Sequence, residues 1–389
     1  MVIHFHPFVL GGADGVRAMN ICRDVSSKLS SKVIEVEFYS IGNYGKSKRN
    51  KNILLTESVT KKYRFPQIPF ESKSSFFDVL NSIWKSFVIL ILTLKYKPIA
   101  LLGEYSISSD CLWFFHKNKR KVKIIIDMHG SVPEEREYCN SSISSSYIER
   151  LTKKEKCSCY IADYVICQSN KMKEHIISKY GAKPDKIFVY NCGVDTTIFK
   201  YSAQQRTIIR KELDIEPDCL VFVYSGGSSL WQKVPEMFSL FNEYHQSDPN
   251  SFFLILSKDK NEFEAQLSNY HNIKDFVRVL SLEFKQVPNY LCAADAGFLL
   301  RDDVVLNRVA SPTKLAEYMA CGLMVVVCKV ADNWINGSGK DYFLYDNLLD
   351  DARNRISSVD KSSIVKYANE MLSLEQDRKT IEQLIDLVK

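Results

Sequence analysis

The chain has 389 residues, of which 46% are hydrophobic and 12% aromatic, enough for two domains that each bury a core. Its 11 cysteines include no pair of CxxC motifs, which argues against a zinc site and is typical of reduced thiols. Residues 1–190 carry 30 Lys and Arg against 18 Asp and Glu, whereas residues 191–389 carry 22 against 28. The basic half indicates an anionic partner, for which lipid headgroups, a lipid diphosphate and nucleic acid are candidates.

The N-terminal sequence Met1–Pro7 has no basic leader followed by a long apolar region, so we expect no signal peptide. The longest apolar run, Phe87–Leu94, is far shorter than the roughly 20 residues of a membrane span, and we interpret it as a core helix. Basic clusters at 46–51, 61–64 and 117–121 are expected to be surface loops that could rest on anionic lipid.

Short apolar runs alternate with helical patterns along the first half, which predicts an α/β unit. Strands are expected at residues 1–5, 33–40, 99–103, 122–128, 164–167 and 186–190. Helices are expected at residues 16–29, 76–95, 108–117, 141–159 and 171–179. Residues 42–73 are polar and basic with poor periodicity, so no regular element is expected there.

The same alternation returns at about residue 220 and predicts a second α/β unit. Its strands are expected at residues 221–224, 252–256, 277–280, 297–300 and 323–328. Its helices are expected at residues 234–244, 262–270, 287–293 and 312–321. The tail from about residue 362 is expected to form two helices.

Between the two units lies a Gly-Val-Asp turn at 193–195, followed by the aromatic residue Phe199. Glycine suits a bend that needs a positive φ. We therefore place an N-terminal domain at 1–192 and a C-terminal domain at 193–365. The helices at 366–389 are expected to pack back toward the N-terminal domain.

Two loops of the first unit follow predicted strands, where α/β proteins bind ligands. One contains Gly11 and Gly12, which let the backbone approach a ligand closely, but it lacks the GxGxxG pattern of a dehydrogenase. The other contains Asp127 and His129, and the histidine is either an active-site group or a structural residue before the next helix. The acidic pair at 134–135 is typical of a helix start.

The segment from Ser311 to Gly322 is the most informative in the chain. Pro312 suits a first helical turn, where free N–H groups and the helix dipole form an anion site to which Lys314 adds charge. Glu317 lies one turn further on the same side and can accept hydrogen bonds from sugar hydroxyls. A helix start that binds phosphate beside a carboxylate that binds a ribose predicts a nucleotide-sugar site.

This segment resembles the donor-binding helix of retaining glycosyltransferases with the GT-B fold, family 4 in particular. Members carry Pro or Gly at the helix start, Glu one turn later, then Ala-Gly and a valine-rich strand. The turn at 193–195 resembles the interdomain signature of the family, and the first glycine loop resembles its counterpart. The resemblance covers about residues 1–330 and is strong over 165–330.

The resemblance implies that a nucleotide-diphosphate sugar binds the second domain. Its diphosphate would contact Lys233 and Lys314, and its ribose would contact Glu317. Further donor contacts are implied for Gly12 and Gly227, for Ser281 near the base, and for Arg308, Pro312, Thr313 and Leu315 near the phosphates.

For catalysis, the resemblance places His129 opposite the reacting sugar, with Asp127 orienting it or holding the acceptor. Lys233 and Glu317 complete the implied catalytic set. We expect no metal, so cations and helix dipoles would stabilise the leaving diphosphate, usually the largest contribution to catalysis. No cofactor is expected, the UDP- or GDP-type sugar being the donor substrate.

The sequence departs from the family in two places. Members carry an Arg and a Lys in the loop after the first strand of the second domain, but here Lys233 stands without the arginine, for which Arg301 or Arg308 could substitute. Members also carry a first glutamate where this chain has Val309. Asn307 and Arg308 are the nearest polar replacements.

The sequence thus predicts the α/β class and a GT-B fold of two Rossmann-like domains with a cleft between them. The predicted function is retaining sugar transfer to a lipid-linked or saccharide acceptor in bacterial capsule, O-antigen or lipopolysaccharide assembly. The protein is expected in the cytoplasm, peripheral on the anionic inner face of the membrane, without a nucleic-acid partner. Two alternatives stay open: a nucleotide-sugar epimerase of the same fold, and a catalytically silent carbohydrate-binding protein.

Overall fold

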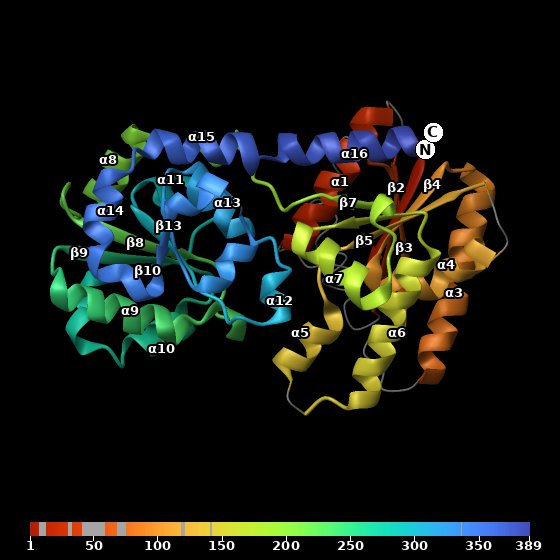
Figure 1. The fold of residues 1–389 in the computed structure, drawn as a ribbon, viewed down its shortest axis with the longest axis horizontal. Coiled ribbons are helices and arrows are strands. Elements are labelled where there is room, and N and C mark those ends of the chain that lie inside the picture. Colours follow the sequence, from red (N-terminus) through yellow and green to blue (C-terminus); the bar gives the residue numbers. More distant parts are fainter. Residues whose placement is uncertain are drawn as a thin grey trace. The chain divides into compact units, whose positions relative to one another are not determined.

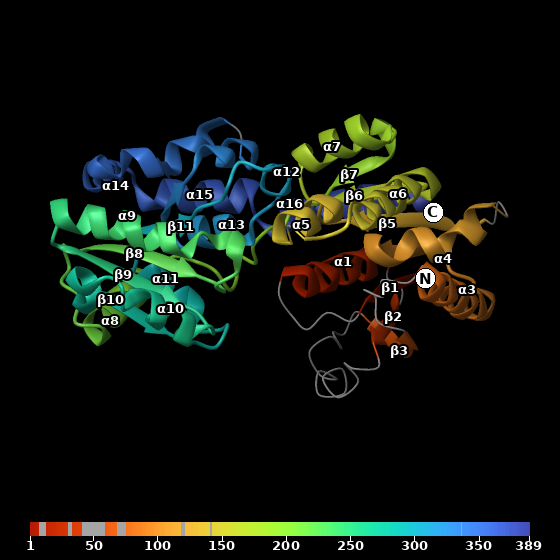
Figure 2. The same cartoon turned by 90° about the horizontal axis from the view of Figure 1, so that it is seen from below.

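The structure is a computed structural model, and it describes residues 1–7, 13–29, 33–40, 59–67, 75–117, 121–140, 142–335 and 337–389. The chain divides into two compact units, each built on one parallel sheet. The first unit comprises Met1–Cys192 and Asp377–Lys389, and the second comprises Gly193–Gln376. In each unit, helices cover both faces of the sheet (Figures 1 and 2). The predicted α/β class with two Rossmann-like units is confirmed.

The sheet of the first unit has seven strands in the order β3-β2-β1-β4-β5-β6-β7. They are β1 (Val2–Pro7), β2 (Val33–Ser40), β3 (Val59–Gln67), β4 (Ala100–Glu104), β5 (Lys123–Met128), β6 (Tyr164–Cys167) and β7 (Ile187–Val189). Every neighbouring pair is parallel, so the carboxyl ends of all seven strands meet at one edge.

Within the residues that the structure describes, six helices connect these strands. They are α1 (Ala13–Leu29), α3 (Ser75–Tyr96), α4 (Tyr105–Lys117), α5 (Val132–Cys139), α6 (Ser145–Ile161) and α7 (Asn170–Tyr180). The single helix expected at 141–159 is wrong at its start, because α5 ends at Cys139 and α6 begins at Ser145. Glu134 and Glu135 lie in the first turn of α5, as their charge predicted.

Strand β3 was not predicted, because charged residues interrupt its apolar pattern. Lys62 lies opposite Glu35 of β2, and its amine lies 3.1 Å from Glu35 and 2.9 Å from Glu37. Arg64 lies 3.5 Å from the same Glu37 carboxylate. The basic cluster at 61–64 therefore lies on a strand, where β2 carboxylates neutralise Lys62 and Arg64 while Lys61 is exposed, so the expectation of a surface loop is wrong. The cluster at 46–51 lies outside the described residues.

The sheet of the second unit has six parallel strands in the order β10-β9-β8-β11-β12-β13. They are β8 (Leu220–Ser225), β9 (Ser251–Leu256), β10 (Val277–Leu280), β11 (Ala296–Leu299), β12 (Met324–Val327) and β13 (Phe343–Tyr345). Side chains on both faces of β8, β9, β11 and β12 are buried, because helices cover both sides. The prediction missed only the short edge strand β13.

The helices of the second unit are α8 (Ala203–Glu212), α9 (Val234–Ser247), α10 (Lys260–Leu267), α11 (Val287–Cys292), α12 (Val305–Arg308), α13 (Thr313–Ala320), α14 (Ala352–Ser358) and α15 (Lys361–Met371). The sequence had indicated α9, α10, α11, α13 and a helix near α15. It had not indicated α8, α12 or α14.

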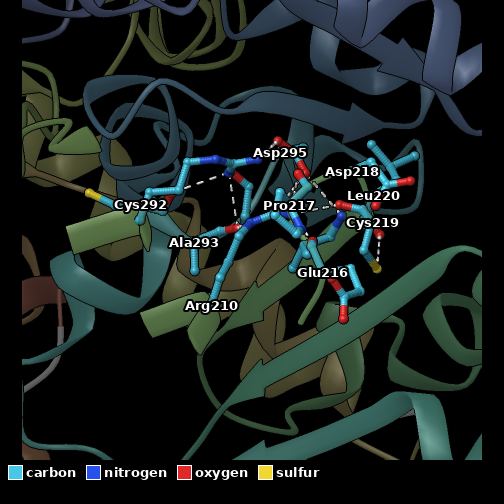
Figure 3. A network of polar contacts seen from close by, with 12 residues as sticks. Arg210, Glu216, Pro217, Asp218, Cys219, Leu220, Cys292, Ala293 and Asp295 are labelled. Carbon is cyan, nitrogen blue, oxygen red and sulfur yellow. Dashed lines mark hydrogen bonds and ion pairs between the residues drawn. The ribbon is translucent and has the colours of Figure 1, made fainter. Parts of the chain in front are cut away.

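A buried arginine fixes α8 to the sheet. The guanidinium of Arg210 pairs with Asp295 at 2.7 Å and donates to the carbonyl of Ala293 at 2.9 Å (Figure 3). It also donates to the carbonyls of Glu216 and Cys219, both at 2.9 Å. One side chain therefore joins α8 to the segment before β8 and to the segment before β11.

The last helix, α16 (Leu374–Val388), begins in the second unit and continues in the first from Asp377. Its residues Ile381, Leu384 and Ile385 are buried in the core of the first unit. The Asp377 carboxylate accepts a hydrogen bond from the backbone N–H of Asn191 at 2.8 Å. The chain thus leaves the first unit at Cys192 and returns to it at Asp377. The sequence had placed the start of the returning helices at residue 366, which is eleven residues too early.

Candidate functional site

The strand order of the second unit reverses between β8 and β11, because the chain builds outward from β8 in one direction and from β11 in the other. In open α/β sheets, ligands bind beside the carboxyl ends of the strands at such a point. Here the loop 226–233 follows β8, and Arg301 comes shortly after β11. Most of the residues predicted to bind a donor lie on these loops or on the start of α13.

A glycine brings the loop after β8 against Lys314. Gly226 has φ +150°, and a Cβ at this position would lie 2.5 Å from Lys314 Cε and 2.8 Å from its Nζ. A side chain at this position would displace the amine, and the positive φ also favours glycine. The same amine lies 5.5 Å from the centre of the Tyr224 ring, whose hydroxyl donates to the carbonyl of Gly227 at 2.6 Å. The lysine and the glycine loop thus form one packed group.

Positive charge is concentrated at this point. Burial, with the nearby Arg301 adding to its effect and Glu317 opposing it, lowers the pKa of Lys314 to about 8. Burial raises the pKa of Glu317, and Lys314 opposes that shift. The Lys314 amine lies 3.3 Å from the side-chain oxygen of Gln232. A bound anion would relieve the mutual repulsion of Lys314 and Arg301.

The start of α13 adds backbone dipoles to these charges. Pro312 is the N-cap residue, with an extended conformation at φ −69°. The N–H of Leu315 donates to the Pro312 carbonyl at 3.0 Å, so in this state it is engaged inside the first turn. Of the three backbone N–H groups that the sequence had offered to an anion at the helix start, those of Thr313 and Lys314 therefore remain candidates. The positive end of the helix dipole adds to the charge of Lys314.

Lys233 lies on the same loop but is already engaged in ion pairs. Its amine lies 2.7 Å from Asp302 and 3.5 Å from Glu236. The hydrogen bond to Asp302 raises the pKa of Lys233, so the lysine stays charged. Contact between Lys233 and a diphosphate would require the amine to leave or share Asp302.

Two predicted donor residues are not brought into this group. Ser281 is exposed after the edge strand β10. Arg308 is exposed on α12, and its guanidinium pairs with Asp303 at 2.6 Å. Of the two arginines considered as substitutes for the missing cation, the structure favours Arg301, because its charge acts on Lys314.

The residues around the missing glutamate are also placed. Val309 is buried, and the buried side chain of Asn307 donates to the carbonyl of Asp302 at 2.9 Å. The carbonyl of Asn307 accepts from the indole of Trp334 at 2.7 Å. Asn307 therefore holds the loop after β11 in place, and its expected role as a polar replacement for the glutamate has no support in these contacts.

Sequence reasoning missed several residues that shape this site. Asp259 follows β9, and its carboxylate accepts from the backbone N–H of Ser228 at 2.8 Å and from the Ser228 hydroxyl at 3.1 Å. It thereby fixes the serine that stands near the expected arginine. Gln232 and Tyr224 were also missed. Their signal was position alone, because all three lie at or just beyond the carboxyl ends of central strands.

In the first unit, Asp127 ends β5 in a buried ion pair. Arg17 of α1 donates to it at 2.7 Å from one nitrogen and 3.0 Å from another, and also donates to the carbonyl of Tyr190 at 2.6 Å. Although burial acts to raise it, Arg17 and His129 hold the pKa of Asp127 well below its ordinary value. This corrects the expectation that Asp127 could hold an acceptor, because its carboxylate is buried and committed to Arg17.

His129 is partly exposed just beyond β5. Its Nδ1 lies 3.6 Å from the Asp127 carboxylate, an ion-pair distance that exceeds a hydrogen bond. A negative charge at this distance can orient the ring. Gly12, the other ligand-loop residue predicted in this unit, lies outside the described residues.

Glu155 of α6 holds the end of the loop that carries His129. This buried carboxylate accepts from the Val132 backbone N–H at 3.0 Å and from the hydroxyl of Tyr180. Burial raises the pKa of Glu155 to about 7. The hydrogen bonds fix the start of α5, and hence the end of the loop. Among the described residues, no group of three His, Cys, Asp or Glu is placed to hold a metal ion.

Part of the chain matches a known protein family. Residues 20–198 match the family model of Glycosyltransferase Family 4. Over 168 residues the chain is 23% identical to a Bacillus subtilis (strain 168) protein named as the teichuronic acid biosynthesis glycosyltransferase TuaH. That match spans 42% of this chain and 40% of the relative, so it covers less than half of either protein.

Two solved structures match almost the whole chain. Anabaena HepE in complex with UDP has a TM-score of 0.71 at 14% identity, over 99% of this chain and all of that one. Sucrose-phosphate synthase from Thermosynechococcus elongatus has a TM-score of 0.72 at 15% identity, over 100% and 99%. The chain has the GT-B fold. Asp127 and His129 lie within the residues that match the family 4 model, whereas Lys314 and Glu317 lie in the second unit, outside that match.

Proposed function

We propose that this protein is a glycosyltransferase that uses a nucleotide-diphosphate sugar as donor. The observation that carries the proposal is the group formed by Gly226, Lys314 and Arg301 at the reversal of strand order, with Glu317 one turn along α13. It combines positive charge, backbone dipoles and a carboxylate within one unit. A diphosphate and a ribose are the chemical groups that such a combination recognises.

The diphosphate would bind at the start of α13. Lys314 and Arg301 supply charge, and the N–H groups of Thr313 and Lys314 supply the helix dipole. When the bond between the sugar and the diphosphate breaks, negative charge on the leaving group increases. Groups already fixed near that charge stabilise the transition state more than the ground state. We infer that this supplies the main catalytic effect without a metal ion.

The ribose would bind to Glu317. Its carboxylate lies beside Lys314, which helps to keep it ionised against the effect of burial. An ionised carboxylate accepts hydrogen bonds from two neighbouring hydroxyls, and such bonds are about twice as strong as those between neutral groups. The pairing of a phosphate-binding helix start with this carboxylate therefore favours a nucleotide over an isolated phosphate.

His129 would act on the reacting sugar, and Asp127 would set its orientation. The Arg17–Asp127 pair fixes the carboxylate, and the carboxylate would in turn orient the imidazole. Retention of configuration at the anomeric carbon remains part of the proposal. The acceptor would be lipid-linked or a saccharide, used in surface polysaccharide assembly at the cytoplasmic face of a membrane. The similarity to a protein named for teichuronic acid biosynthesis supports only the polysaccharide part of this proposal.

Substitution of His129 tests the catalytic assignment. We expect His129→Ala to lower the turnover of a donor and acceptor pair while the affinity for the free nucleoside diphosphate stays unchanged. Gln168, also at the end of a central strand of this unit, offers the control Gln168→Ala for general damage to the domain. Near-normal turnover in folded His129→Ala protein would return this histidine to a structural role.

A screen of nucleoside diphosphates and their sugars by thermal shift tests the donor assignment. A ligand at about one hundred times its dissociation constant should raise the unfolding free energy by about 2.7 kcal/mol. Release of nucleotide that depends on an acceptor would identify a transferase. Release without an acceptor would point to the epimerase alternative, and binding without release would point to a silent binding protein.

A further inference from the structure

Helix α3 carries an apolar face that is open to solvent. Its exposed residues recur every three or four positions, so they lie along one side of the helix. The principal ones are Phe76, Leu80, Ile83, Phe87, Ile91 and Leu94. Phe76 and Ile83 expose 65% and 62% of their surface. Soluble monomers rarely expose an apolar patch of this extent unless it contacts a partner or a membrane.

Helix α4 packs beside α3 and widens this surface (Figures 1 and 2). Trp113 and Phe114 of α4 each expose 43% of their surface. A pocket of about 620 Å³ lies between the helices, and its lining includes Ile83, Phe87 and Leu90 with both aromatic residues. We call the exposed apolar residues of α3, together with Trp113 and Phe114, the apolar face.

The opposite side of α3 holds the helix to the first unit. Val88, Ile89 and Leu92 are buried. The amine of the buried Lys85 lies 5.6 Å from the centre of the Phe38 ring on β2. The run 87–94, expected to belong to a core helix, is therefore half core and half surface.

By length and composition, α3 could cross a membrane, and it is the one such helix within the ranges that the structure describes. Crossing would require its packed side to leave the core, and would draw Lys85 away from Phe38. A helix with one side fixed to a folded domain and an apolar side free fits the plane of a membrane interface better. The geometry of α3 therefore favours a helix that lies on a bilayer over one that spans it.

Exposed lysines flank the apolar face. Lys95 and Lys97 lie at the end of α3, and Lys117 and Lys121 lie at the end of α4. Each helix precedes a strand of the same parallel sheet, so both C-terminal ends point to one edge of that sheet. These lysines supply charge complementary to anionic headgroups, and aromatic residues such as Trp113 are favoured at the boundary of lipid and water.

We propose that the apolar face is a membrane-docking surface, which inserts into the interfacial layer of an anionic bilayer while the flanking lysines contact headgroups. The proposal goes beyond the proposed transferase function and does not depend on turnover. It also differs from attachment by basic loops alone, because apolar insertion persists when salt screens the charges. The attachment should therefore weaken at high salt without being abolished.

Sedimentation with vesicles tests this surface on the full-length protein. The probes are phosphatidylcholine vesicles with and without phosphatidylglycerol. We expect binding to the anionic vesicles, and a loss of at least about tenfold in affinity for the double variant Ile83→Glu with Phe87→Glu, because two apolar side chains no longer insert. The matched control is Ile208→Glu on α8 of the second unit, where the isoleucine is also exposed on a helix.

The charged part of the surface has its own variant. Lys95→Gln with Lys117→Gln should weaken binding to anionic vesicles and reduce its dependence on salt, and should leave residual binding.

Equal binding by wild type and the Ile83→Glu, Phe87→Glu variant would overturn the proposal, as would no binding to anionic vesicles at low salt. A wild-type dimer that the same variant dissociates would assign the apolar face to a second copy instead. Protein that resists extraction by alkaline carbonate would assign α3 to a membrane span. Thermal shift with UDP on each variant confirms folding and tests the donor site separately.

Discussion

At the scale of single residues, Lys314 determines the character of the candidate donor site. Its amine contacts the place where Gly226 has no side chain, and Arg301 adds a second positive charge nearby. Two cations kept close without a bound anion cost free energy, which a diphosphate would recover on binding. Under the proposed function, this arrangement would favour a doubly charged ligand.

The pH dependence of nucleotide binding follows from this lysine. Its pKa is lowered to about 8 in the free protein, and a bound diphosphate would raise it again. Above pH 8 the free lysine loses its proton, so binding must take up a proton and the affinity for UDP should fall. The fall should approach tenfold per pH unit at most. Titration calorimetry of UDP from pH 7 to above pH 9, in roughly half-unit steps, measures this slope.

Lys314→Gln provides the control for that titration. The variant should bind UDP more weakly at pH 7 and show a flatter dependence above pH 8, because the titrating group is gone. A wild-type affinity that stays constant through this range would contradict the assignment of the diphosphate to Lys314.

Glu317 allows the ribose contact to be separated from the phosphate contact. Glu317→Ala should weaken UDP binding by about 1.5–3 kcal/mol, the range for a hydrogen bond to a charged group. Binding of inorganic pyrophosphate, which has no ribose, should weaken much less or improve. Competition calorimetry measures both ligands. The exposed Glu264→Ala on α10 is the control, and an equal loss for both ligands would show that Glu317 acts on the phosphates.

Sequence reasoning correctly placed residues whose position depends on neighbours in the chain. Lys314 and Glu317 share one helix, so their spacing alone placed them on the same side. It failed for residues whose partners lie far along the chain. Asp127 pairs with Arg17, 110 positions away, and Arg308 pairs with Asp303 on the surface instead of joining Lys314. The roles that the resemblance assigns to these residues in a reaction stay predictions.

At the scale of elements, the ion pairs between α8 and Asp295 hold to the sheet a helix that the sequence had not indicated. We call this group of contacts the α8 clamp. Arg206, Arg210 and Lys361 surround Asp295, whose carboxylate also accepts the backbone N–H of Val221 at 3.0 Å. Although burial acts to raise it, these three cations hold the pKa of Asp295 below its ordinary value. These contacts therefore link four segments: α8, the start of β8, the residue before β11, and the start of α15.

Arg210→Ala should lower the unfolding free energy by about 3–5 kcal/mol, because it removes one partner of a buried ion pair and leaves several carbonyls without their donor. The exposed Lys211→Ala, on the same helix, should change stability by less than about 0.5 kcal/mol. Chemical denaturation monitored by circular dichroism measures both. A loss below about 1 kcal/mol for Arg210→Ala would contradict the clamp.

The same pair predicts how that difference changes with pH. The folded state lowers the pKa of Asp295, so its contribution to stability is present above the pKa of an unfolded aspartate, about 3.9, and is lost as pH falls. The gap between wild type and Arg210→Ala should therefore be full at neutral pH and shrink below about pH 4.

Strand β3 shows that a strand can lack the apolar alternation by which strands are predicted. Its charged residues obscured a strand because apolar alternation was the signal sought. Glu35 and Glu37 also interrupt β2, but that strand kept enough apolar residues to be recognised. Only the parallel register of the two strands, which sets Lys62 opposite Glu35, shows that the charges neutralise one another.

At the scale of the whole molecule, α16 returns the chain to the first unit and completes its core. Leu384 is buried there beside residues of α1 and the central strands. Leu384→Ala should cost about 2–5 kcal/mol, the range for a cavity in a core. Leu387→Ala, three residues on, is the control, because Leu387 exposes 55% of its surface. Equal stability of the two variants in thermal unfolding would show that the first unit folds without α16.

The sequence by itself determined the alternation of strands and helices, the turn at 193–195, and the helix that joins Lys314 to Glu317, because periodicity, glycine and short spacing act locally. Tertiary structure decided which distant groups meet: Arg301 with Lys314, Arg17 with Asp127, and α16 with the first core. It also decided that α3 keeps one apolar side exposed. Burial and electrostatic pairing depend on the arrangement of the whole sheet, and no local pattern encodes them.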